Sequence, residues 1–427
     1  MENFTIKGDA TLCVTQKNDA ETEKREIPIQ PKIYGDIPDV PTQNLGGGIL
    51  FDFNDGCRMK FPDGDDEYHV VLKDMDSNLI LYSVDVTRGA WVVSVKKYFV
   101  RFRIEVYKKG QPELVYHHDY DARGKTVLVQ LPVGTLGDSI AWFSYVERFQ
   151  KKTGCRLVCA MTGKIADIFK KEYPEIEFVT PEETKNIKPY ACYLLGLFFR
   201  GNVDNQPRDF RQVGLHRTAG MILGLAGREL DDEAPRVDLT AERSIGEKYV
   251  CIATQASSGC KYWNNPLGWD RVVAYLKDRG YRVLCIDRDR VQGHGLVWHH
   301  IPQGAEDFTG DLPLQQRIEL IKDAEFFIGL SSGLSWLAWC CKVPVVLISG
   351  FTEAENEFYT PYRVINYHPC HGCWNDMRCD FDHFDYLWCP RHKGTNRHFE
   401  CSRMITPEQV INTINHVIKK ENENENG

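Results

Sequence analysis

The stretch AEFFIGLSSGLSWLAWCCKVPVVLISG, from Ala324 to Gly350, decides how the chain is expected to fold. Two short apolar runs, Phe326–Leu330 and Val343–Ile348, flank a Ser-Ser-Gly turn and a segment with helical spacing. Short runs of β-branched and aromatic residues are typical of strands that are buried on both faces of a parallel sheet. The stretch therefore predicts a strand–helix–strand unit with a right-handed crossover.

The turn Ser331-Ser332-Gly333 lies between the first of these strands and the helix. Open α/β sheets bind ligands at the carboxyl ends of their strands, and the free N–H groups of a helix N-terminus suit a phosphate. The same residues would also make an ordinary turn in which a serine caps the helix. The turn is a candidate phosphate site, with simple capping as the alternative.

The length, composition and net charge limit the classes of function that this chain can have. The 427 residues exceed one ordinary domain, and 42% hydrophobic residues are enough for sizeable cores. The net charge of −8 disfavours a nucleic-acid partner, because a phosphate backbone requires cationic surface. No apolar run approaches the ~18 residues of a membrane helix, so no membrane insertion is expected. The first residues show no apolar signal segment, so we expect a cytoplasmic protein.

Residues 1–125 are expected to form an N-terminal β-rich domain. After an irregular, proline-containing lead-in to about residue 47, apolar and polar residues alternate in short runs that turn signals separate. This pattern predicts antiparallel strands in a β-sandwich or a β-barrel. The region holds no cluster of catalytic residue types, so we interpret it as an accessory or assembly domain.

Two α/β halves are expected to follow. Strand and helix patterns alternate over 126–228 and over 248–350, which predicts two facing, Rossmann-like halves with parallel sheets. An acidic linker is expected over 229–247. A cysteine-rich insert (351–405) and a C-terminal helix with a disordered, low-complexity tail, ENENENG (406–427), complete the chain. The predicted fold class is α/β with an added β domain.

Three turns are expected to meet in the cleft between the halves. The first holds Gly137-Asp138 at the start of a helix, where Asp138 is either a general base or an acid that only favours the helix dipole. The second, Thr254–Trp263, has small residues and one lysine, Lys261, which either neutralises a diphosphate leaving group or is simply solvated. The third is the Ser331-Ser332-Gly333 turn.

Asp287 ends the predicted strand YRVLCID of the second half. In nucleotide-binding folds an acid at this position accepts hydrogen bonds from the ribose hydroxyls. The alternative is an acid that only begins the following loop.

The second half resembles the ADP-heptose glycosyltransferases. Those enzymes carry a small-residue turn followed by Lys and Trp, and a loop that typically reads Asp-Thr-Gly-Leu-Ser-His-Leu-Ala; here that loop reads SSGLSWLA, from Ser331 to Ala338. Gly137-Asp138 matches the family's Gly-Asp, whose Asp is regarded as the catalytic base. The resemblance covers roughly 126–350 and implies a GT-B fold. From these turns and the resemblance together, the expected ADP-sugar residues are Gly137, Thr254, Ser257, Lys261, Trp263, Asp287, Ser331, Ser332, Gly333 and Leu334.

The sequence departs from the lipopolysaccharide-core members of that family. Ser331 and Ser332 replace Asp-Thr, Trp336 replaces His, and the N-terminal and cysteine-rich regions are additions. One branch, the bacterial autotransporter heptosyltransferases, shares these departures, and the chain resembles it over nearly its whole length. That resemblance implies O-heptosylation of serines on an autotransporter adhesin passenger, a dodecameric ring and one iron ion per subunit.

The expected mechanism uses two residues. Asp138 removes the proton from an acceptor serine hydroxyl as it attacks the anomeric carbon of ADP-heptose, and Lys261 offsets the charge on the departing ADP. Attack from the face opposite the leaving group inverts the anomeric centre. No metal is expected at the catalytic centre.

The cysteine-rich insert predicts a metal site. Five of the fifteen cysteines lie within residues 370–401, and without a secretion signal such a cluster favours a metal over disulfides. Cys370, Cys373, Cys389 and Cys401 are expected to close a structural Cys₄ site, with Cys379 left out. Spacing alone favours zinc, and iron (Fe³⁺) is implied only by the resemblance. The alternative is a set of reduced, unliganded thiols.

Two other functions stay open at this point. One is a lipopolysaccharide-core heptosyltransferase, against which the added N-terminal domain and the lack of a basic amphipathic helix both count. The other is a non-catalytic, metal-containing scaffold that binds a nucleotide or a nucleic acid.

Overall fold

The structure, a computed structural model, describes residues 33–199, 203–295 and 297–425. The strand–helix–strand unit predicted for Ala324–Gly350 is confirmed as β18 (Phe327–Leu330), α6 (Gly333–Cys340) and β19 (Val345–Ile348). The two strands pair in parallel, from Phe327 opposite Val345 to Leu330 opposite Ile348. Every residue of both strands is buried, which explains why they read as continuous apolar runs.

This unit belongs to a parallel, six-stranded sheet with the order β17-β14-β13-β18-β19-β20. If these six strands are numbered 1 to 6 along the chain, their order across the sheet is 3-2-1-4-5-6, which is the doubly wound order of the Rossmann fold. The strand order reverses between β13 and β18, so a ligand is expected outside the carboxyl ends of these two strands. The remaining elements are β13 (Tyr249–Ile252), α4 (Gly268–Lys277), β14 (Arg282–Cys285), β17 (Glu306–Asp307), α5 (Leu314–Ile321) and β20 (Arg363–Val364).

The first half has a parallel, four-stranded sheet with the order β11-β10-β9-β12, which reverses between β9 and β12. Its longest helix, α1 (Leu136–Thr153), ends at Gly154, whose left-handed backbone (φ 66°) returns an N–H to Gln150. The other elements are β9 (Thr126–Gln130), β10 (Arg156–Ala160), α2 (Gly163–Ala166), β11 (Glu177–Val179), β12 (Ala191–Leu194) and α3 (Leu215–Ile222). The two predicted Rossmann-like halves are therefore present.

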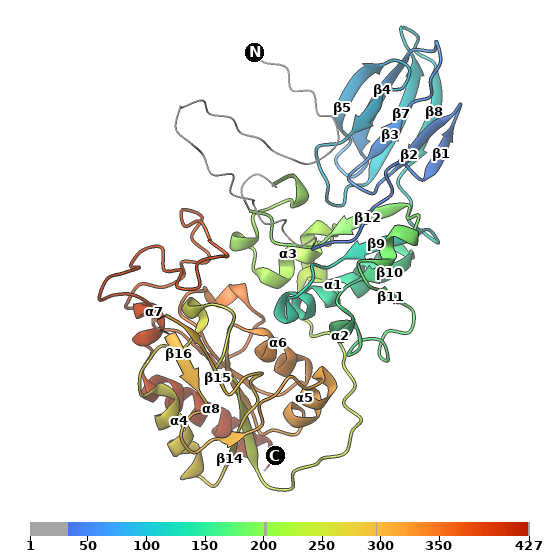
Figure 1. The fold of residues 1–427 in the computed structure, drawn as a ribbon. Helices are drawn as coiled ribbons and strands as arrows, with labels where there is room; N and C mark the ends of the chain where they lie inside the picture. Colours follow the sequence, from blue (N-terminus) through green and yellow to red (C-terminus); the bar gives the residue numbers. More distant parts are fainter. Residues whose placement is uncertain (1–32, 200–202, 296, 426–427) are drawn as a thin grey trace, which may run out of the picture. The chain divides into compact units, whose positions relative to one another are not determined.

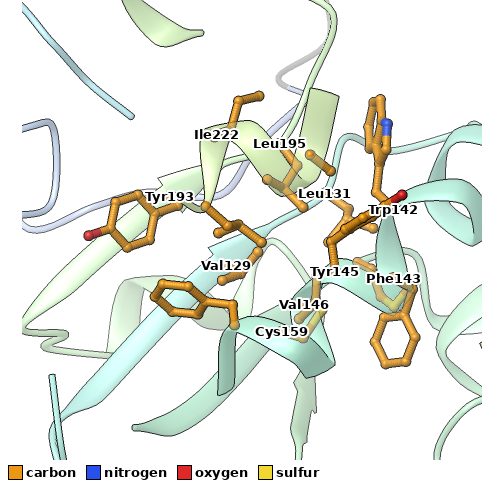
Figure 2. Packing of buried hydrophobic residues seen from close by; sticks show 14 of the residues in the cluster. Val129, Leu131, Trp142, Phe143, Tyr145, Val146, Cys159, Tyr193, Leu195 and Ile222 are labelled. Carbon is orange, nitrogen blue, oxygen red and sulfur yellow. The ribbon is translucent and has the colours of Figure 1, made fainter. Parts of the chain in front are cut away.

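Helix α1 buries one face against the first sheet and against α3 (Figure 2). Trp142, Phe143 and Val146 recur at helical spacing, and all three are fully buried or nearly so. They meet Val129 of β9 and Cys159 of β10 in one cluster. This packing fixes the direction in which the N-terminus of α1 points.

The N-terminal region contains two separate antiparallel, four-stranded sheets, with the orders β1-β2-β3-β6 and β5-β4-β7-β8. In Figure 1, β4, β5, β7 and β8 lie side by side. Phe51 of one sheet contacts His118 of the other, with ring centroids 4.4 Å apart, so the two sheets share a core. The strands are β1 (Gln43–Gly46), β2 (Ile49–Asp52), β3 (Arg58–Lys60), β4 (Tyr68–Asp74), β5 (Leu79–Val86), β6 (Trp91–Val93), β7 (Phe102–Lys108) and β8 (Leu114–Asp119).

Three expectations need correction. The lead-in predicted to be irregular to about residue 47 contains β1, which forms because it pairs with β2; residues 1–32 lie outside the described residues. The sequence pattern missed the antiparallel hairpin β15 (Val291–His294) and β16 (Val297–His300). The described part of the tail predicted to be disordered, 421–425, instead continues helix α8 (Pro407–Glu425), because extending an existing helix needs no new nucleation; residues 426–427 lie outside the described residues. A short helix, α7 (Glu400–Arg403), precedes it.

The cysteines outside the C-terminal cluster behave as small hydrophobes. All of those that the structure describes are buried, without disulfides: Cys57, Cys155, Cys159, Cys192, Cys251, Cys260, Cys285, Cys340 and Cys341. Cys13 lies outside the described residues. In the part of the chain that the structure describes, no helix is both long enough and apolar enough to cross a membrane.

Replacing Phe143 with alanine tests the core of the first half. The Phe143 ring stacks on Phe169 with centroids 4.1 Å apart and meets Tyr173 edge-on at 4.8 Å. We expect Phe143→Ala to lower the free energy of unfolding of this half by about 3–5 kcal/mol, because it leaves a cavity. Denaturant titration followed by fluorescence measures the change. Tyr359→Ala, at a side chain that is 75% exposed, is the control, and an equal loss in both variants would contradict this account of the core.

Candidate active site

A cavity of about 320 Å³ lies where the predicted turns of both halves meet. Thr135 and Asp138 come from the first half, Lys261 and Ser331 from two turns of the second. The first half also contributes Leu197 and Leu215, and the turn after β13 contributes Ser257 and Ser258. The cysteine-rich region contributes the remaining lining residues: Phe351, Asn356, Trp374, Phe381, His383, Phe384, Asp385 and Tyr386.

Two glycines allow the halves to approach closely at this cavity. A Cβ atom on Gly333, at the start of α6, would lie 2.9 Å from the side chain of Leu136, at the start of α1. A Cβ atom on Gly137 would lie 3.2 Å from Trp336 of α6. The N-termini of α1 and α6 therefore meet at the predicted cleft. Gly137 and Gly333 act here as contact points between the helices.

Asp138 lies in the first turn of α1 and is half-buried in the cavity wall. Burial raises the pKa of its carboxyl above the ordinary value, and the charge of Lys261, the Thr135 hydroxyl and His383 oppose that rise. A carboxylate with a raised pKa is a stronger base than an ordinary aspartate, which suits proton abstraction. Lys261 and His383 line the same cavity as Asp138.

Lys261 ends a short 3-10 turn, Gly259–Lys261, that follows strand β13. This turn is tied to the cysteine-rich region, because the N–H of Gly259 donates to the carbonyl of Tyr386 at 2.9 Å and the Ser258 hydroxyl donates to the same oxygen at 3.2 Å. Ser257 is exposed at the cavity. The turn that carries Lys261 is thus positioned by strand β13 before it and by its hydrogen bonds to Tyr386.

Asp287 and Thr254 lie beneath this turn. The buried carboxylate of Asp287 accepts hydrogen bonds from the N–H and the hydroxyl of Thr254, at 2.8 and 3.0 Å, and from the N–H of Gln255 at 3.2 Å. Burial raises the pKa of Asp287. Because both carboxylate oxygens are already occupied by backbone and side-chain donors, this acid shapes the turn after β13.

The Ser331-Ser332-Gly333 turn is held by a hydrogen bond to the buried ion pair of Glu357 and Arg363. The hydroxyl of Ser331 donates to Glu357, and Glu357 pairs with Arg363. Burial alone would raise the pKa of Glu357, but Arg363 and the hydrogen bonds hold it below its usual value. The hydroxyl of Ser332 has no partner among the described residues. Leu334 packs against the core.

Trp263 does not line this cavity. Its indole is fully buried, donates to the carbonyl of Ile405 at 2.9 Å and meets Trp269 edge-on. It borders a different and larger cavity, of about 540 Å³, beside the β15–β16 hairpin. The geometry gives Trp263 a packing role between the turn after β13 and the chain that enters α8.

Sequence reasoning missed the residues that the cysteine-rich region contributes to the cavity. Trp374, Phe381, His383, Phe384 and Tyr386 all line it. Four of them belong to the run FDHFDY between Cys379 and Cys389, which is rich in aromatic residues for a loop, and Trp374 follows Cys373 directly. The spacing of the flanking cysteines indicates a metal site and gives no sign that the residues between them line the cavity.

The predicted metal ligands lie close together. The sulfurs of Cys370 and Cys373 are 4.0 Å apart, and tetrahedral geometry with metal–sulfur bonds of about 2.3 Å requires about 3.8 Å. Burial and the nearby sulfurs of Cys370, Cys373 and Cys389 raise the pKa of Cys401 well above its usual value. Arg391 donates to the sulfur of Cys370 at 3.5 Å, which favours a thiolate. Cys370 and Cys373 are thus spaced as two ligands of one metal ion would be, and Cys389 and Cys401 lie nearby.

A second set of potential ligands overlaps this one. Cys370, His392 and Glu400 present ligand atoms within 4.8 Å of one another in the described part of the chain. Glu400, however, already accepts hydrogen bonds from Arg397, at 2.5 and 2.7 Å, and from the N–H of Cys370 at 2.9 Å. Those contacts occupy both carboxylate oxygens of Glu400, which would have to give up hydrogen bonds to bind a metal ion.

Comparison with known proteins decides the family. Residues 46–110 match the N-terminal domain of glycosyltransferase TibC, and residues 222–375 match glycosyltransferase family 9 (heptosyltransferase). The chain is 55% identical over 379 residues to the autotransporter heptosyltransferase TibC of Escherichia coli O78:H11 (strain H10407 / ETEC), which covers 88% of this chain and 92% of TibC. The chain belongs to the autotransporter heptosyltransferase family. It is a glycosyltransferase of the heptosyltransferase class.

A crystal structure of a relative supports the fold. The dodecameric, iron-containing heptosyltransferase TibC in complex with ADP-D-beta-D-heptose superposes with a TM-score of 0.87 at 52% identity, covering 91% of this chain and 100% of TibC. The GT-B-like arrangement with an added N-terminal β domain is thereby confirmed.

One family member differs in activity. The inactive autotransporter heptosyltransferase BimC of Burkholderia thailandensis (strain ATCC 700388 / DSM 13276 / CCUG 48851 / CIP 106301 / E264) is 41% identical over 380 residues, covering 88% of this chain and 87% of BimC. The roles of individual residues in this chain are therefore argued from its own geometry.

The contact between α1 and α6 can be tested with a single methyl group. Gly333→Ala should push the two helix N-termini apart, because the added Cβ meets Leu136 at 2.9 Å. We expect heptosyl transfer to slow by about 10- to 100-fold, since displacements near 1 Å have effects of this size. Gly163→Ala is the matched control, because Gly163 also begins a helix and a Cβ there meets no atom within 4 Å. Transfer at the wild-type rate by Gly333→Ala would contradict the close contact.

Proposed function

We propose that this chain transfers heptose from ADP-heptose to serine hydroxyls of an autotransporter adhesin passenger. The observation that carries the proposal is the shared cavity that Asp138 of one half and Lys261 of the other both line, where the charge of Lys261 acts to lower the pKa of Asp138. A general base and a cation for a leaving diphosphate are the two groups that this reaction requires. Family membership supplies the sugar nucleotide, because TibC was crystallised with ADP-D-beta-D-heptose.

The proposed step is a single displacement. As the serine oxygen bonds to the anomeric carbon, its proton passes to the carboxylate of Asp138. The bond between that carbon and the diphosphate oxygen breaks, and ADP leaves with the electron pair. Attack from the side opposite ADP inverts the anomeric centre. The raised pKa of Asp138 favours acceptance of the proton.

The diphosphate is proposed to lie at the N-terminus of α6. The unpaired N–H groups there carry partial positive charge, and Lys261 adds a full charge in the same cavity. The unpartnered hydroxyl of Ser332 offers a further donor. The buried Glu357–Arg363 pair keeps Ser331 in place. This arrangement does not require the aspartate that lipopolysaccharide-core enzymes carry at position 331.

We also propose that the cysteine cluster holds one iron ion per subunit. The relative TibC is an iron-containing protein, which supports iron over zinc as the metal. Cys370, Cys373, Cys389 and Cys401 would hold it. Bound there, the ion supplies a structural cross-link and no redox step. Cys260, which directly precedes Lys261, interacts with Cys389 and Cys401, so the cross-link lies next to the catalytic turn.

A homo-oligomer, with the dodecamer of TibC as the precedent, is part of the proposal. Leu79 and Ile80 of β5 are 63% and 62% exposed. β5 is an edge strand of its sheet, and exposed apolar edges are typical of surfaces that another copy covers.

The first test is the transfer itself. Incubation with ADP-heptose and a serine-rich passenger fragment, followed by intact mass spectrometry of the fragment, should show successive additions of heptose. Asp138→Asn should lower the rate by about 100-fold or more while ADP binding persists, because it removes only the base. The wild-type rate should fall as pH decreases through the pKa of Asp138, which burial places above that of an ordinary aspartate.

Asp167→Asn is the control for this test. Asp167 is an exposed acid that pairs only with Lys170 in the contacts of its side chain. Its variant should keep the wild-type rate and pH profile. An unmodified passenger with ADP-heptose still bound would redirect the proposal to a different acceptor, and an active Asp138→Asn would remove Asp138 as the base.

The metal site is tested by metal content. Cys373→Ser should lose most of the bound iron, measured by plasma mass spectrometry of the purified protein, and should lower the melting temperature. Cys379→Ser should retain iron and stability, because this cysteine is proposed to lie outside the ligand set. Equal iron in both variants would contradict the proposed Cys₄ site, and loss of iron in Cys379→Ser alone would show that Cys379 is a ligand in place of Cys373.

A further inference from the structure

One wall of the catalytic cavity belongs to neither Rossmann-like half. The segment Phe381–Tyr386, with the sequence FDHFDY, contributes Phe381, His383, Phe384, Asp385 and Tyr386 to it. Neither the base nor the diphosphate turn of the proposed function uses these residues. The reaction needs a surface for the acceptor as well as one for the sugar nucleotide, and this wall is not used by the residues assigned to the sugar nucleotide.

The charge of this segment argues against contact with the diphosphate. The segment holds no lysine or arginine; Asp382 does not line the cavity, and Asp385, which does, pairs with Lys393 at 2.6 Å. The cation and the helix N-terminus that attract a diphosphate lie elsewhere in the cavity, at Lys261 and α6. The segment therefore faces the uncharged partner of the reaction.

Phe384 is presented to solvent in a fixed backbone conformation. Its side chain is 88% exposed, although it lines the cavity. Its N–H donates to the carboxylate of Asp382 at 2.9 Å, which closes a local turn and limits the positions that Phe384 can adopt. An exposed phenylalanine held rigidly at the mouth of an active site is a typical contact for a polypeptide.

His383 precedes Phe384 in the same wall. Its ring packs edge-on against Phe381, with centroids 4.8 Å apart, and against Phe199 at 5.3 Å. Desolvation by these neighbours lowers the pKa of His383, and the charges of Asp138 and Lys261 also act on it. A neutral imidazole this close to the base can hold a hydroxyl by a hydrogen bond.

We propose that Phe381–Tyr386 is the acceptor-binding surface of this enzyme. Phe384 contacts the polypeptide beside the reacting serine, and His383 orients the serine hydroxyl toward Asp138. The inference rests on the proposed function, since it assigns the acceptor side of the same cavity. His383 is a positioning residue, because it acts through the hydroxyl and takes no proton in the step described above.

The anchoring of the segment supports this assignment. The carbonyl of Tyr386 accepts hydrogen bonds from Gly259 and Ser258, which directly precede Lys261 in the donor turn. At the other end, the indole N–H of Trp388 donates to the carbonyl of Asp380 at 2.9 Å. The surface proposed for the acceptor is thus fixed relative to the lysine of the leaving group.

Steady-state kinetics with a serine-rich passenger fragment test the proposal. Phe384→Ala should raise the KM for the fragment by about 10-fold or more, because an apolar contact of this size is lost, and should leave the dissociation constant of ADP unchanged. Phe384→Tyr should recover most of the affinity. Tyr359→Ala, at an exposed ring outside the cavity, is the control.

His383 is tested by kcat. His383→Ala should lower kcat by about 10-fold or more with ADP binding intact, and His383→Gln, which keeps a hydrogen-bonding group, should recover part of the rate. Normal acceptor kinetics in both Phe384→Ala and His383→Ala, with active wild-type enzyme, would overturn this inference alone. Weaker ADP binding in these variants would place the segment on the donor side and overturn it as well. A wild-type enzyme that modifies no passenger would instead overturn the proposed function.

Discussion

The close contact between the N-termini of α1 and α6 is the constraint on which the site depends. Gly333 leaves no space for a side chain against Leu136, and Gly137 leaves little against Trp336, so the two halves meet closely here. That contact brings Asp138 from one sheet and Lys261 from the other to one cavity. Each sheet reverses its strand order at this edge, so both crevices open toward the same space.

The cysteine-rich region is more than an added stability element. It closes the candidate cavity with aromatic side chains, and the carbonyl of Tyr386 accepts a hydrogen bond from the turn that carries Lys261. Cys260 of the same turn is buried in one hydrophobic cluster with Cys389 and Cys401. A structural metal held there would therefore influence catalysis through the position of Lys261, without taking part in the reaction.

The sequence predicts the parallel sheets well, because buried strands such as Phe327–Leu330 and Val345–Ile348 are uniformly apolar and short. The turns that hold Asp138, Lys261 and Ser331 were also predictable, since the ends of parallel strands converge.

Other features depend on contacts between distant segments and leave no local pattern. Asp287 looks like a ribose ligand in the sequence, yet its carboxylate is occupied by Thr254 and Gln255. Trp263 follows the lysine as in related enzymes, yet its indole is buried against Ile405, far along the chain. The place of His383 in the cavity wall depends on how a long loop returns to the first half, which no periodicity describes.

A crystal structure of this protein with ADP-heptose bound would test the central claim most directly. The account predicts that the diphosphate lies within hydrogen-bonding distance of Lys261 and of the N–H groups at the start of α6, with the anomeric carbon between the diphosphate and Asp138. A sugar nucleotide bound in the larger cavity beside Trp263, or an Asp138 carboxylate turned away from the anomeric carbon, would contradict it.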